Sequence, residues 1–395
     1  MKIGVAGPVS LSMLASYVHR GKDLPAGYLF SPMATWVEEL LHRGHQISLF
    51  TLAPEISKPQ TFTGKQLTIH IGRYRTHRRA RDFFKQERQD LLDDMQDDPV
   101  DVLHAHWTYE FALAALSSGY PVLVTAHDAP WEILRLHPHP YLIMRLLMAY
   151  QVCRKASVMS VVSPYLELNY RKRMLYRGQL EVIPNPVSDA LFDKPARVNR
   201  TRKVIFASVL VGWAGRKNGQ VLMEAFAKVH QQYPDSELWM FGDGHGPGQA
   251  AQRWAEAHGF TQGVQFRGQT PHPELLRELS EKVDILVHPA LEESFGIAIA
   301  EAMALHIPVV GGKFSGAVLN TLGEGGLLVD VRSSQEIADA MLILAKDPDL
   351  RFTLGRLGRE RAKQHYSLNK TTSMYEILYQ QILSNSKEKL RKDLR

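Results

Sequence analysis

Short runs of β-branched and other apolar residues alternate along this chain with longer amphipathic segments, and this alternation limits the possible folds more than any other feature. Neighbouring parallel strands need a long crossover connection, usually a helix, so the alternation predicts parallel sheets covered by helices. We expect strands at residues 2–6, 46–51, 100–105, 121–126, 157–162 and 180–183, and again at 203–209, 236–241, 264–266, 284–287, 308–311 and 326–329. We expect helices at residues 33–43, 81–95, 109–116, 140–155, 164–174, 218–232, 248–257, 273–279 and 295–305.

The chain is too long for one hydrophobic core, because 395 residues are about twice what a single core usually organises. The strand–helix pattern restarts after a proline-containing and charged stretch, which predicts a linker. The expected segments are a first domain at 1–188, a linker at 189–202, a second domain at 203–367, and a C-terminal helix with a polar tail at 368–395. The predicted fold class is α/β, with two Rossmann-like parallel-sheet domains facing each other across a ligand-binding cleft.

Composition excludes several classes of protein. An apolar fraction of 45% and a charged fraction of 22% exclude a disordered or fibrous chain. A single cysteine, Cys153, excludes an internal disulfide and favours a reducing compartment. The longest apolar stretch, 141–153, is interrupted by Arg145 and is too short to span a bilayer, and the first residues do not resemble a secretory signal. We therefore expect a cytoplasmic protein, and its net charge of +6 permits contact with phosphates or an anionic membrane.

The most informative segment is residues 288–304, His-Pro-Ala-Leu-Glu-Glu-Ser-Phe-Gly-Ile-Ala-Ile-Ala-Glu-Ala-Met-Ala. It is predicted to be a strand end, a loop and a helix whose first amides are unpaired, and such amides suit a phosphate. Gly296 lets a phosphate approach the backbone. Glu293 and Glu301 are eight positions apart, about 12 Å at helical rise, which matches the sugar-to-ribose distance of a nucleotide-sugar.

This segment resembles the Glu-x7-Glu motif of retaining, GT-B-fold glycosyltransferases of family 4. Flanking segments at 241–244, 266–268, 307–310 and 325–329 match the family in order and spacing. The resemblance implies that Glu301 binds the nucleotide ribose and Glu293 the transferred sugar. It also implies that the C-terminal helix crosses back to the first domain, and that the diphosphate meets the amides around Ser294, Phe295 and Gly296. The alternative is that Glu301 is a solvated helix carboxylate and Glu293 a helix cap.

The family also uses an arginine and a lysine to neutralise the departing diphosphate without a metal ion. Lys217 fits the lysine of this pair. Gly212 and Trp213 occupy the usual arginine position, so Arg216 is the nearest substitute. Two cations at a helix start can stabilise a leaving diphosphate. The alternative is a pair of exposed cations.

Two further segments of the second half resemble the nucleotide site of the family. The turn containing Gly242 and Asp243 is expected beside the nucleotide, and Arg267 and Gly268 are expected at the base pocket, largely through backbone groups. Pro247 breaks a dinucleotide-binding glycine pattern counted from Gly242, so the turn does not support an NAD-binding interpretation.

In the first half the match is weaker. The resemblance implies that His127 reaches the donor sugar, and Gly27 is taken as the phosphate-facing glycine, with Gly7 as the alternative; an extra stretch at 8–24 departs from the family. His104 and His106 could form a metal pair, but no third ligand has suitable spacing. We expect a structural role for His104 and no metal site.

A run of basic residues with interleaved aromatic residues marks the first domain. It comprises Arg73, Arg75, Arg78, Arg79, Arg81, Lys85 and Arg88. A solvated face is the simpler interpretation, and docking on anionic lipid near a lipid-linked acceptor is the functional one. No nucleic-acid-binding motif accompanies the run, so we expect no nucleic-acid partner.

Together these patterns predict a retaining, metal-independent glycosyltransferase of the hexosyltransferase type. It would move a sugar from a nucleotide-diphosphate-sugar, with UDP favoured, to a hydroxyl of a glycan or lipid-linked acceptor held by the first domain. Its setting would be bacterial cell-surface polysaccharide or lipopolysaccharide synthesis, peripheral on the inner face of the membrane, with no cofactor. The alternatives are a non-catalytic nucleotide-sugar or sugar binding protein of the same fold and an NAD-dependent oxidoreductase.

Overall fold

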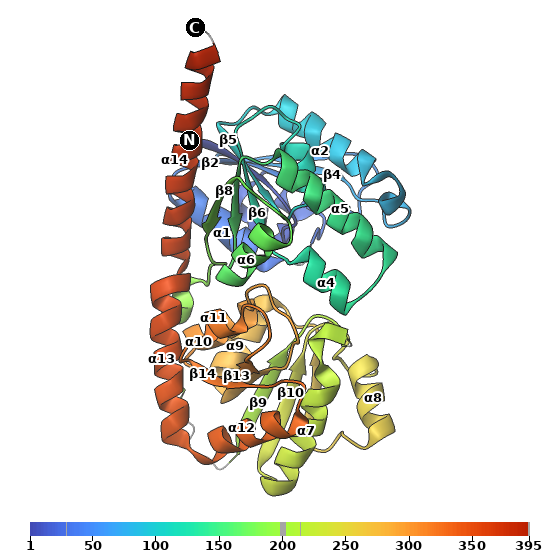
Figure 1. The fold of residues 1–395 in the computed structure, drawn as a ribbon, viewed down its shortest axis with the longest axis vertical. Helices are drawn as coiled ribbons and strands as arrows, with labels where there is room; N and C mark the ends of the chain where they lie inside the picture. Colours follow the sequence, from blue (N-terminus) through green and yellow to red (C-terminus); the bar gives the residue numbers. More distant parts are fainter. Residues whose placement is uncertain (29, 198–202, 214, 394–395) are drawn as a thin grey trace. The chain divides into compact units, whose positions relative to one another are not determined.

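The computed structural model describes residues 1–28, 30–197, 203–213 and 215–393, with side chains up to 388. Internal contacts divide the chain into two units, one formed by Met1–Pro186 with Leu368–Arg395 and the other by Val187–Ser367 (Figure 1). Of the predicted linker, residues Asp189–Asp193 form a 3-10 helix within the second unit, and residues 198–202 lie outside the described residues. The end of the predicted polar tail, residues 394–395, lies outside them too.

The first unit contains an eight-stranded sheet in the order β3-β4-β2-β1-β5-β6-β7-β8. All neighbours are parallel except the antiparallel pair β3–β4. Its strands are β1 (Lys2–Ala6), β2 (Gln46–Ala53), β3 (Gln60–Thr63), β4 (Leu67–Arg73), β5 (Val102–His106), β6 (Val122–Ala126), β7 (Val158–Val161) and β8 (Gln179–Val182). The sequence prediction missed β3 and β4. Strand β3 is a short, mostly exposed edge strand, and β4 is preceded by the hairpin from β3 rather than by a helix, so the strand–helix alternation does not reveal it.

Helices of the first unit surround this sheet. They are α1 (Ser31–His42), α2 (Lys85–Asp97), α3 (Glu110–Ala115), α4 (Pro130–Leu136), α5 (Pro140–Lys155), α6 (Pro164–Lys172) and α14 (Leu368–Asp393). The helix expected to begin at residue 81 begins at Lys85, because Phe83 and Phe84 adopt left-handed backbone angles (φ +54° and +58°) that interrupt it.

The extra stretch at residues 8–24 is an integral part of the first unit. It forms two short 3-10 helices, Leu11–Tyr17 and Gly21–Asp23. Leu11 and Leu14 are fully buried in the core of the unit. The His19 amide donates to the Thr63 carbonyl at 2.8 Å, which ties the stretch to β3.

Helix α14 joins the first unit although it comes last in the chain. Arg43, just after α1, is ion-paired with Glu376 at 2.6 Å. The Tyr379 hydroxyl lies 2.6 Å from Nδ1 of buried His104. The other ring nitrogen of His104 lies 2.6 Å from Thr125 Oγ1, so His104 has the structural role that the sequence predicted.

The second unit contains a six-stranded parallel sheet in the order β11-β10-β9-β12-β13-β14. Its strands are β9 (Val204–Val209), β10 (Ser236–Phe241), β11 (Val264–Gly268), β12 (Ile285–His288), β13 (Val309–Gly312) and β14 (Gly326–Val329). This is the strand order of a Rossmann sheet, whose order reverses between the first and fourth strands, here β9 and β12. Each of these strands was predicted from the sequence.

The helices of the second unit are α7 (Gly219–Gln232), α8 (Ala250–His258), α9 (His272–Lys282), α10 (Ile297–Ala304), α11 (Val318–Leu322), α12 (Ser334–Lys346) and α13 (Pro348–Tyr366). Helices α7 and α12 pack side by side (Figure 1). The apolar face of α7 is buried at Leu222, Ala225, Phe226 and Val229. Within the described residues, no helix combines the length and apolarity needed to cross a membrane.

Candidate functional site

The candidate site lies in the second unit at the carboxyl ends of β9 and β12. These strands are neighbours, and the sheet order reverses between them, which is where open α/β sheets bind ligands. The loop after β9 carries Arg216 and Lys217, and the loop after β12 carries residues 289–296. The Leu291 amide donates to the Arg216 carbonyl at 2.7 Å, so the two loops are joined directly.

Glu293 and Lys217 form the central ion pair of the site. Lys217 Nζ lies 2.5 Å from Glu293 Oε1, and both side chains are only 14% exposed. His288, the last residue of β12, places Nε2 3.2 Å from the same oxygen. Burial by itself would raise the pKa of the Glu293 carboxyl, but Lys217 and His288 outweigh it and hold this pKa far below its ordinary value. Glu293 is therefore a buried carboxylate that stays ionised.

Arg216 is held by the neighbouring carboxylate rather than by Glu293. Its guanidinium lies 3.3 Å from both the carbonyl oxygen and Oε2 of Glu292, a side chain that is 4% exposed. The Ser294 hydroxyl donates to Glu292 Oε1 at 3.4 Å. The structure thus brings Arg216, Lys217, Glu293 and Ser294 together, as the sequence predicted, with Glu292 as an additional member.

The start of α10 provides a set of backbone donors. Helix α10 begins at Ile297, after Gly296 in a left-handed conformation (φ +86°) that a side chain would strain. In the described part of the chain, the amides of Gly296, Ile297 and Ala298 donate no hydrogen bond. Phe295 is buried, and its carbonyl accepts from Thr321 Oγ1 at 2.6 Å, which fixes this turn. The arrangement suits an anion.

Glu293 stands in the loop before α10, as the sequence predicted. This loop pairs with the segment after β13: the Glu293 amide donates to the Ser315 carbonyl at 3.3 Å, and the Glu293 carbonyl accepts from Ala317 at 2.8 Å. The helix expected over residues 295–305 covers Ile297–Ala304. The separation of about 12 Å that assumed helical rise over all eight positions is therefore not a valid estimate here.

At the other end of α10, Glu301 meets His272, the first residue of α9. His272 Nε2 lies 2.7 Å from Glu301 Oε1. Burial lowers the pKa of His272, but the bond to the Glu301 carboxylate outweighs burial and leaves this pKa raised. Glu301 Oε2 has no hydrogen-bond partner among the described residues, so one oxygen of this carboxylate remains for a ligand.

The predicted base-pocket residues also gather at this edge of the sheet. The Gly242 amide donates to the Gly268 carbonyl at 2.7 Å, and both glycines have positive φ. A Cβ at Gly242 would meet the Leu210 carbonyl oxygen at 1.8 Å, so only glycine fits this turn. The Asp243 carbonyl accepts from Gly212, which joins the turn to the loop after β9. Arg267 does not extend freely: it is ion-paired with buried Glu278.

In the first unit, His127 belongs to a stack of aromatic rings at the ends of β5 and β6. Its Nε2 lies 2.9 Å from His106 Nδ1, and its ring lies over Trp107 at 4.4 Å. Burial lowers the pKa of His127 to about 3, so the ring is neutral near pH 7. His104 and His106 stack at 4.1 Å, and no group of three or more potential metal ligands occurs among the described residues.

The two candidate glycines of the first unit occupy different places. Gly7 directly follows β1, and a Cβ there would meet Met33 Cε at 2.7 Å and His106 Cβ at 3.1 Å. Gly27 has φ +66° and pairs with Ser10 in a short antiparallel bridge. By these contacts Gly7 lies next to the histidine cluster, whereas Gly27 lies against Leu11.

Two members of the basic run are neutralised by neighbouring carboxylates. Arg73 is paired with Asp90 at 2.6 Å. Arg75 is paired with both Glu87 and Asp82, at 2.6 and 2.9 Å. These arginines stabilise the connection between β4 and α2, so they do not contribute free positive charge to a surface.

Sequence reasoning missed three members of the site: His288, His272 and Glu292. His288 and Glu292 stand in the segment that was singled out, and their position at a strand end is the signal that could have identified them. Nothing in the local sequence links His272 to Glu301, because only the packing of α9 beside α10 brings them together.

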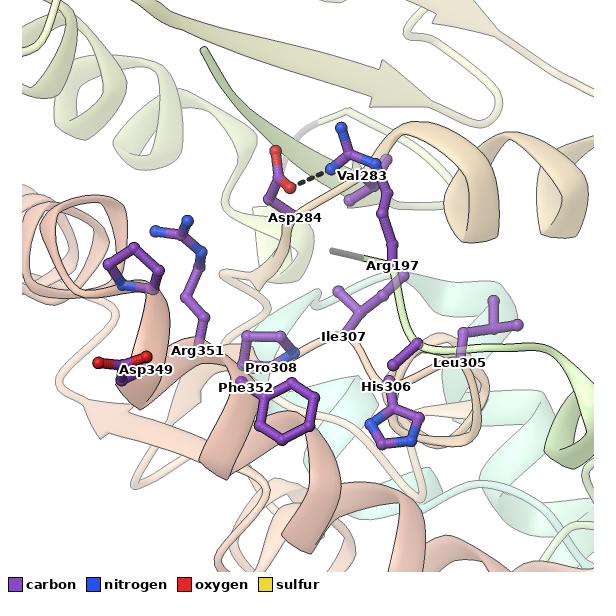
Figure 2. A pocket seen from close by; sticks show the side chains of 12 residues that line it. Arg197, Val283, Asp284, Leu305, His306, Ile307, Pro308, Asp349, Arg351 and Phe352 are labelled. Atoms are coloured by element: carbon purple, nitrogen blue, oxygen red, sulfur yellow. Dashed lines mark hydrogen bonds and ion pairs between the residues drawn. The ribbon is translucent and has the colours of Figure 1, made fainter. Parts of the chain in front are cut away.

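A separate cavity of about 200 Å³ lies at the other end of the strands of this sheet, away from the candidate site. Figure 2 shows Arg197 reaching toward Asp284, with His306 and Phe352 on the other side. Asp284 immediately precedes β12, so this cavity is at the amino ends of the strands. It contains none of the predicted site residues.

Comparison with known proteins identifies the family to which the chain belongs. The family model described as Glycosyltransferase Family 4 matches residues 33–191, and the one described as Glycosyl transferases group 1 matches residues 201–347. N-acetyl-alpha-D-glucosaminyl L-malate synthase from Bacillus anthracis is 22% identical over 307 residues, covering 74% of this chain and 77% of that protein.

Solved structures show the same fold. Sucrose-phosphate synthase from Thermosynechococcus elongatus superposes with a TM-score of 0.76 at 20% identity, covering 98% of this chain and all of that one. Anabaena HepE, in complex with UDP and glucose, gives a TM-score of 0.68 at 15% identity, covering 96% and 100%. The two Rossmann-like units are therefore those of the GT-B fold.

The fold and site define an enzyme that transfers sugars. The chain belongs to the family 4 (group 1) glycosyltransferases, because family models of this type match most of both halves. The predictions of a GT-B fold, of this family and of a hexosyltransferase-type glycosyltransferase are confirmed.

The ion pair at the centre of the site makes a testable contribution to stability. Lys217→Met leaves the buried Glu293 carboxylate without its main partner, and we expect a loss of about 3–5 kcal/mol at pH 7. Glu293 in the native protein has a lowered pKa, so its contribution is present above the unfolded pKa and is lost as pH falls through the folded one. In the variant, burial without Lys217 raises this pKa, so the deficit shrinks as acid protonates Glu293.

Urea unfolding of both proteins at pH 7 and pH 5, followed by circular dichroism, measures this difference. Lys217→Met/Glu293→Gln, which removes both charges, should be more stable than Lys217→Met alone. If Lys217→Met loses the same stability at both pH values, or if the double variant is no more stable than Lys217→Met, Glu293 is not a buried carboxylate stabilised by Lys217.

Proposed function

We propose that this glycosyltransferase moves a hexose from a UDP-linked donor to a hydroxyl group with retention of anomeric configuration and without a metal ion. The observation that carries the proposal is the pairing of Lys217 with Glu293 directly before the unpaired amides of α10. A cation, a carboxylate and an anion-binding helix start are adjacent there, as cleavage of a sugar–diphosphate bond requires.

Each group has a role in this reaction. Lys217, Arg216 and the amides from Ser294 to Ala298 stabilise charge on the departing diphosphate, because preorganised donors are most effective where charge develops. Glu293 binds hydroxyls of the transferred sugar. The acceptor hydroxyl attacks the face that the diphosphate leaves, which preserves the configuration. We assign no covalent nucleophile.

The nucleotide end of the donor is assigned to the opposite end of α10. Glu301 keeps one carboxylate oxygen for the ribose while His272 fixes the other at 2.7 Å. The joined turns of Gly242, Asp243 and Gly268 supply backbone groups for the base, with Arg267 beside them. UDP is favoured because the similar Anabaena HepE structure contains UDP and glucose.

The first unit is assigned to the acceptor and to one contact with the donor sugar. Neutral His127, oriented by His106, can hydrogen-bond a sugar hydroxyl. The acceptor class is a glycan or lipid-linked molecule of bacterial cell-surface polysaccharide or lipopolysaccharide synthesis. This places the enzyme in the cytoplasm, peripheral on the inner face of the membrane, with the exposed cations Arg78, Arg81 and Lys85 facing anionic lipid.

The two motif glutamates should fail in different ways. Glu301→Ala removes a charge-assisted hydrogen bond to the ribose, so UDP affinity should fall by about 1.5–3 kcal/mol. Glu293→Ala should leave UDP affinity nearly intact and instead lower turnover of the full donor, because the sugar that it contacts is absent from UDP. Calorimetry with UDP, together with transfer rates from UDP-hexose, measures both. If Glu293→Ala loses UDP binding while Glu301→Ala binds UDP normally, the nucleotide lies at Glu293 and the sugar at Glu301, opposite to the proposed orientation of the donor.

Transfer should not depend on a divalent cation. Lys217, Arg216 and the α10 amides supply the positive potential that a metal would otherwise provide. We expect the transfer rate with UDP-hexose to be unchanged in excess EDTA. If activity disappears in chelator and returns with Mg²⁺ or Mn²⁺, the proposed stabilisation of the leaving group is wrong.

A matched control can distinguish membrane docking through the basic run from a general effect of positive charge on the protein. Each basic side chain near an anionic surface contributes roughly 1 kcal/mol, so neutralising Arg78, Arg81 and Lys85 to glutamine should strongly weaken binding to phosphatidylglycerol vesicles. Arg154, Lys155 and Lys172 are equally exposed in the same unit and provide a control of equal charge. Cosedimentation at low and high salt measures the effect. If both triple variants lose the same amount of vesicle binding, the basic run is only a solvent-exposed face and not a docking surface.

A further inference from the structure

A cavity of about 320 Å³ lies in the first unit where the loops after β5 and β6 meet α4 and α5. Helices α4 and α5 lie side by side around it (Figure 1). Tyr109 and Asp128 contribute from the two loops, and Tyr141 and Arg145 from α5. The proposed function assigns no residue of this cavity.

Arg145 is the unusual member of this lining. Its side chain is 20% exposed, and its guanidinium carbon lies 3.3 Å from the centre of the Tyr109 ring. Within the described residues, the nearest carboxylate oxygen, Glu110 Oε2, is 3.8 Å away, which is too far for a hydrogen bond. The guanidinium donates a long hydrogen bond to the Tyr141 hydroxyl at 3.3 Å, and its other hydrogen-bond partner is the neutral Tyr109 hydroxyl. Most of its five N–H groups therefore lack an ionised acceptor.

The other polar groups around the cavity are already organised. The buried Tyr109 hydroxyl donates to Asp128 Oδ2 at 2.8 Å, which fixes the ring on which Arg145 stacks. Burial raises the pKa of Tyr109 well above its ordinary value, so this hydroxyl keeps its proton. Glu110 is buried beside Arg145 and partly compensates its positive charge, but it accepts no hydrogen bond from the guanidinium.

We propose that this cavity binds the acceptor through an anionic group, a carboxylate or a phosphate, that pairs with Arg145 while the tyrosine rings cover the adjoining hydroxylated carbon skeleton. A planar guanidinium held over an aromatic ring presents a fixed fork of donors, and such a fork matches carboxylate and phosphate oxygens. This inference rests on the proposed function, since it identifies the chemistry of the acceptor.

The chemistry of the cavity argues against a purely structural role for Arg145. A guanidinium that only supports the fold is normally saturated by backbone carbonyls or carboxylates, as Arg351 is by the carbonyls of Leu344 and Ala345. Arg145 borders open space instead.

Binding to the full chain, without donor, tests the inference. Glycerol 1-phosphate, D-glycerate and glycerol are titrated separately and followed by saturation-transfer NMR, so the phosphate, the carboxylate and the uncharged polyol are compared. We expect at least one anion to bind and glycerol not to. Arg145→Gln should weaken that binding by about tenfold or more, and Arg145→Lys, which keeps the charge but not the fork, should weaken it less. Arg135→Gln, an identical change at an arginine on α4 that is 67% exposed, should have no effect.

The outcomes separate this inference from the proposed function, because UDP is titrated into the same proteins by calorimetry. Failure of both anions to bind the wild type, equal binding of glycerol, or unchanged anion binding in Arg145→Gln overturns the anionic acceptor site. If the wild type binds an anion but does not bind UDP, the proposal of a UDP-linked donor is wrong and the anionic acceptor site stands. If Arg145→Gln does not fold, Arg145→Lys and Tyr141→Phe decide, and anion affinities equal to wild type in both overturn the site.

Discussion

Ionised Glu293 inside the second unit is the constraint on which the site depends. A buried carboxylate is costly unless a cation compensates it, and here Lys217 does so, while His288 lies beside the same oxygen from a second strand end. Because the pair needs both loops in place, it holds the loop after β9 against the loop after β12. That contact in turn positions the amides at the start of α10. The ion pair that compensates the charge of Glu293 therefore also sets the position of the amides that suit an anion.

The strand order explains why these groups meet at this edge. In a Rossmann sheet the crossover connections leave in opposite directions from the two central strands, so their following loops diverge and leave room for a ligand. The glycines of the site meet a related demand. Gly242 and Gly268 allow two loops to touch through their backbones, and Gly296 turns the chain into α10 without a side chain in the way.

The first unit uses a different balance of interactions. Its histidine cluster is neutral, since burial depresses the pKa of His104, His106 and His127, and stacking and hydrogen bonds replace ion pairs there. Charge appears instead at Arg145, stacked on Tyr109. The two candidate sites therefore differ in character: an ion pair lies at the centre of one, and neutral stacked rings with a partly buried arginine nearby form the other.

The sequence by itself determined the strand–helix alternation, the two Rossmann-like halves and the segment from His288 to Ala304, because period and motif spacing are local properties. It did not determine β3, the start of α10, or the partners His272 and Glu292. Those depend on which elements become neighbours: a hairpin edge, a loop drawn toward Gly316, and α9 packed beside α10. Tertiary structure alone decided that Glu301 shares its carboxylate with His272 and that Arg73 and Arg75 are neutralised, since both outcomes require contacts between residues far apart in sequence.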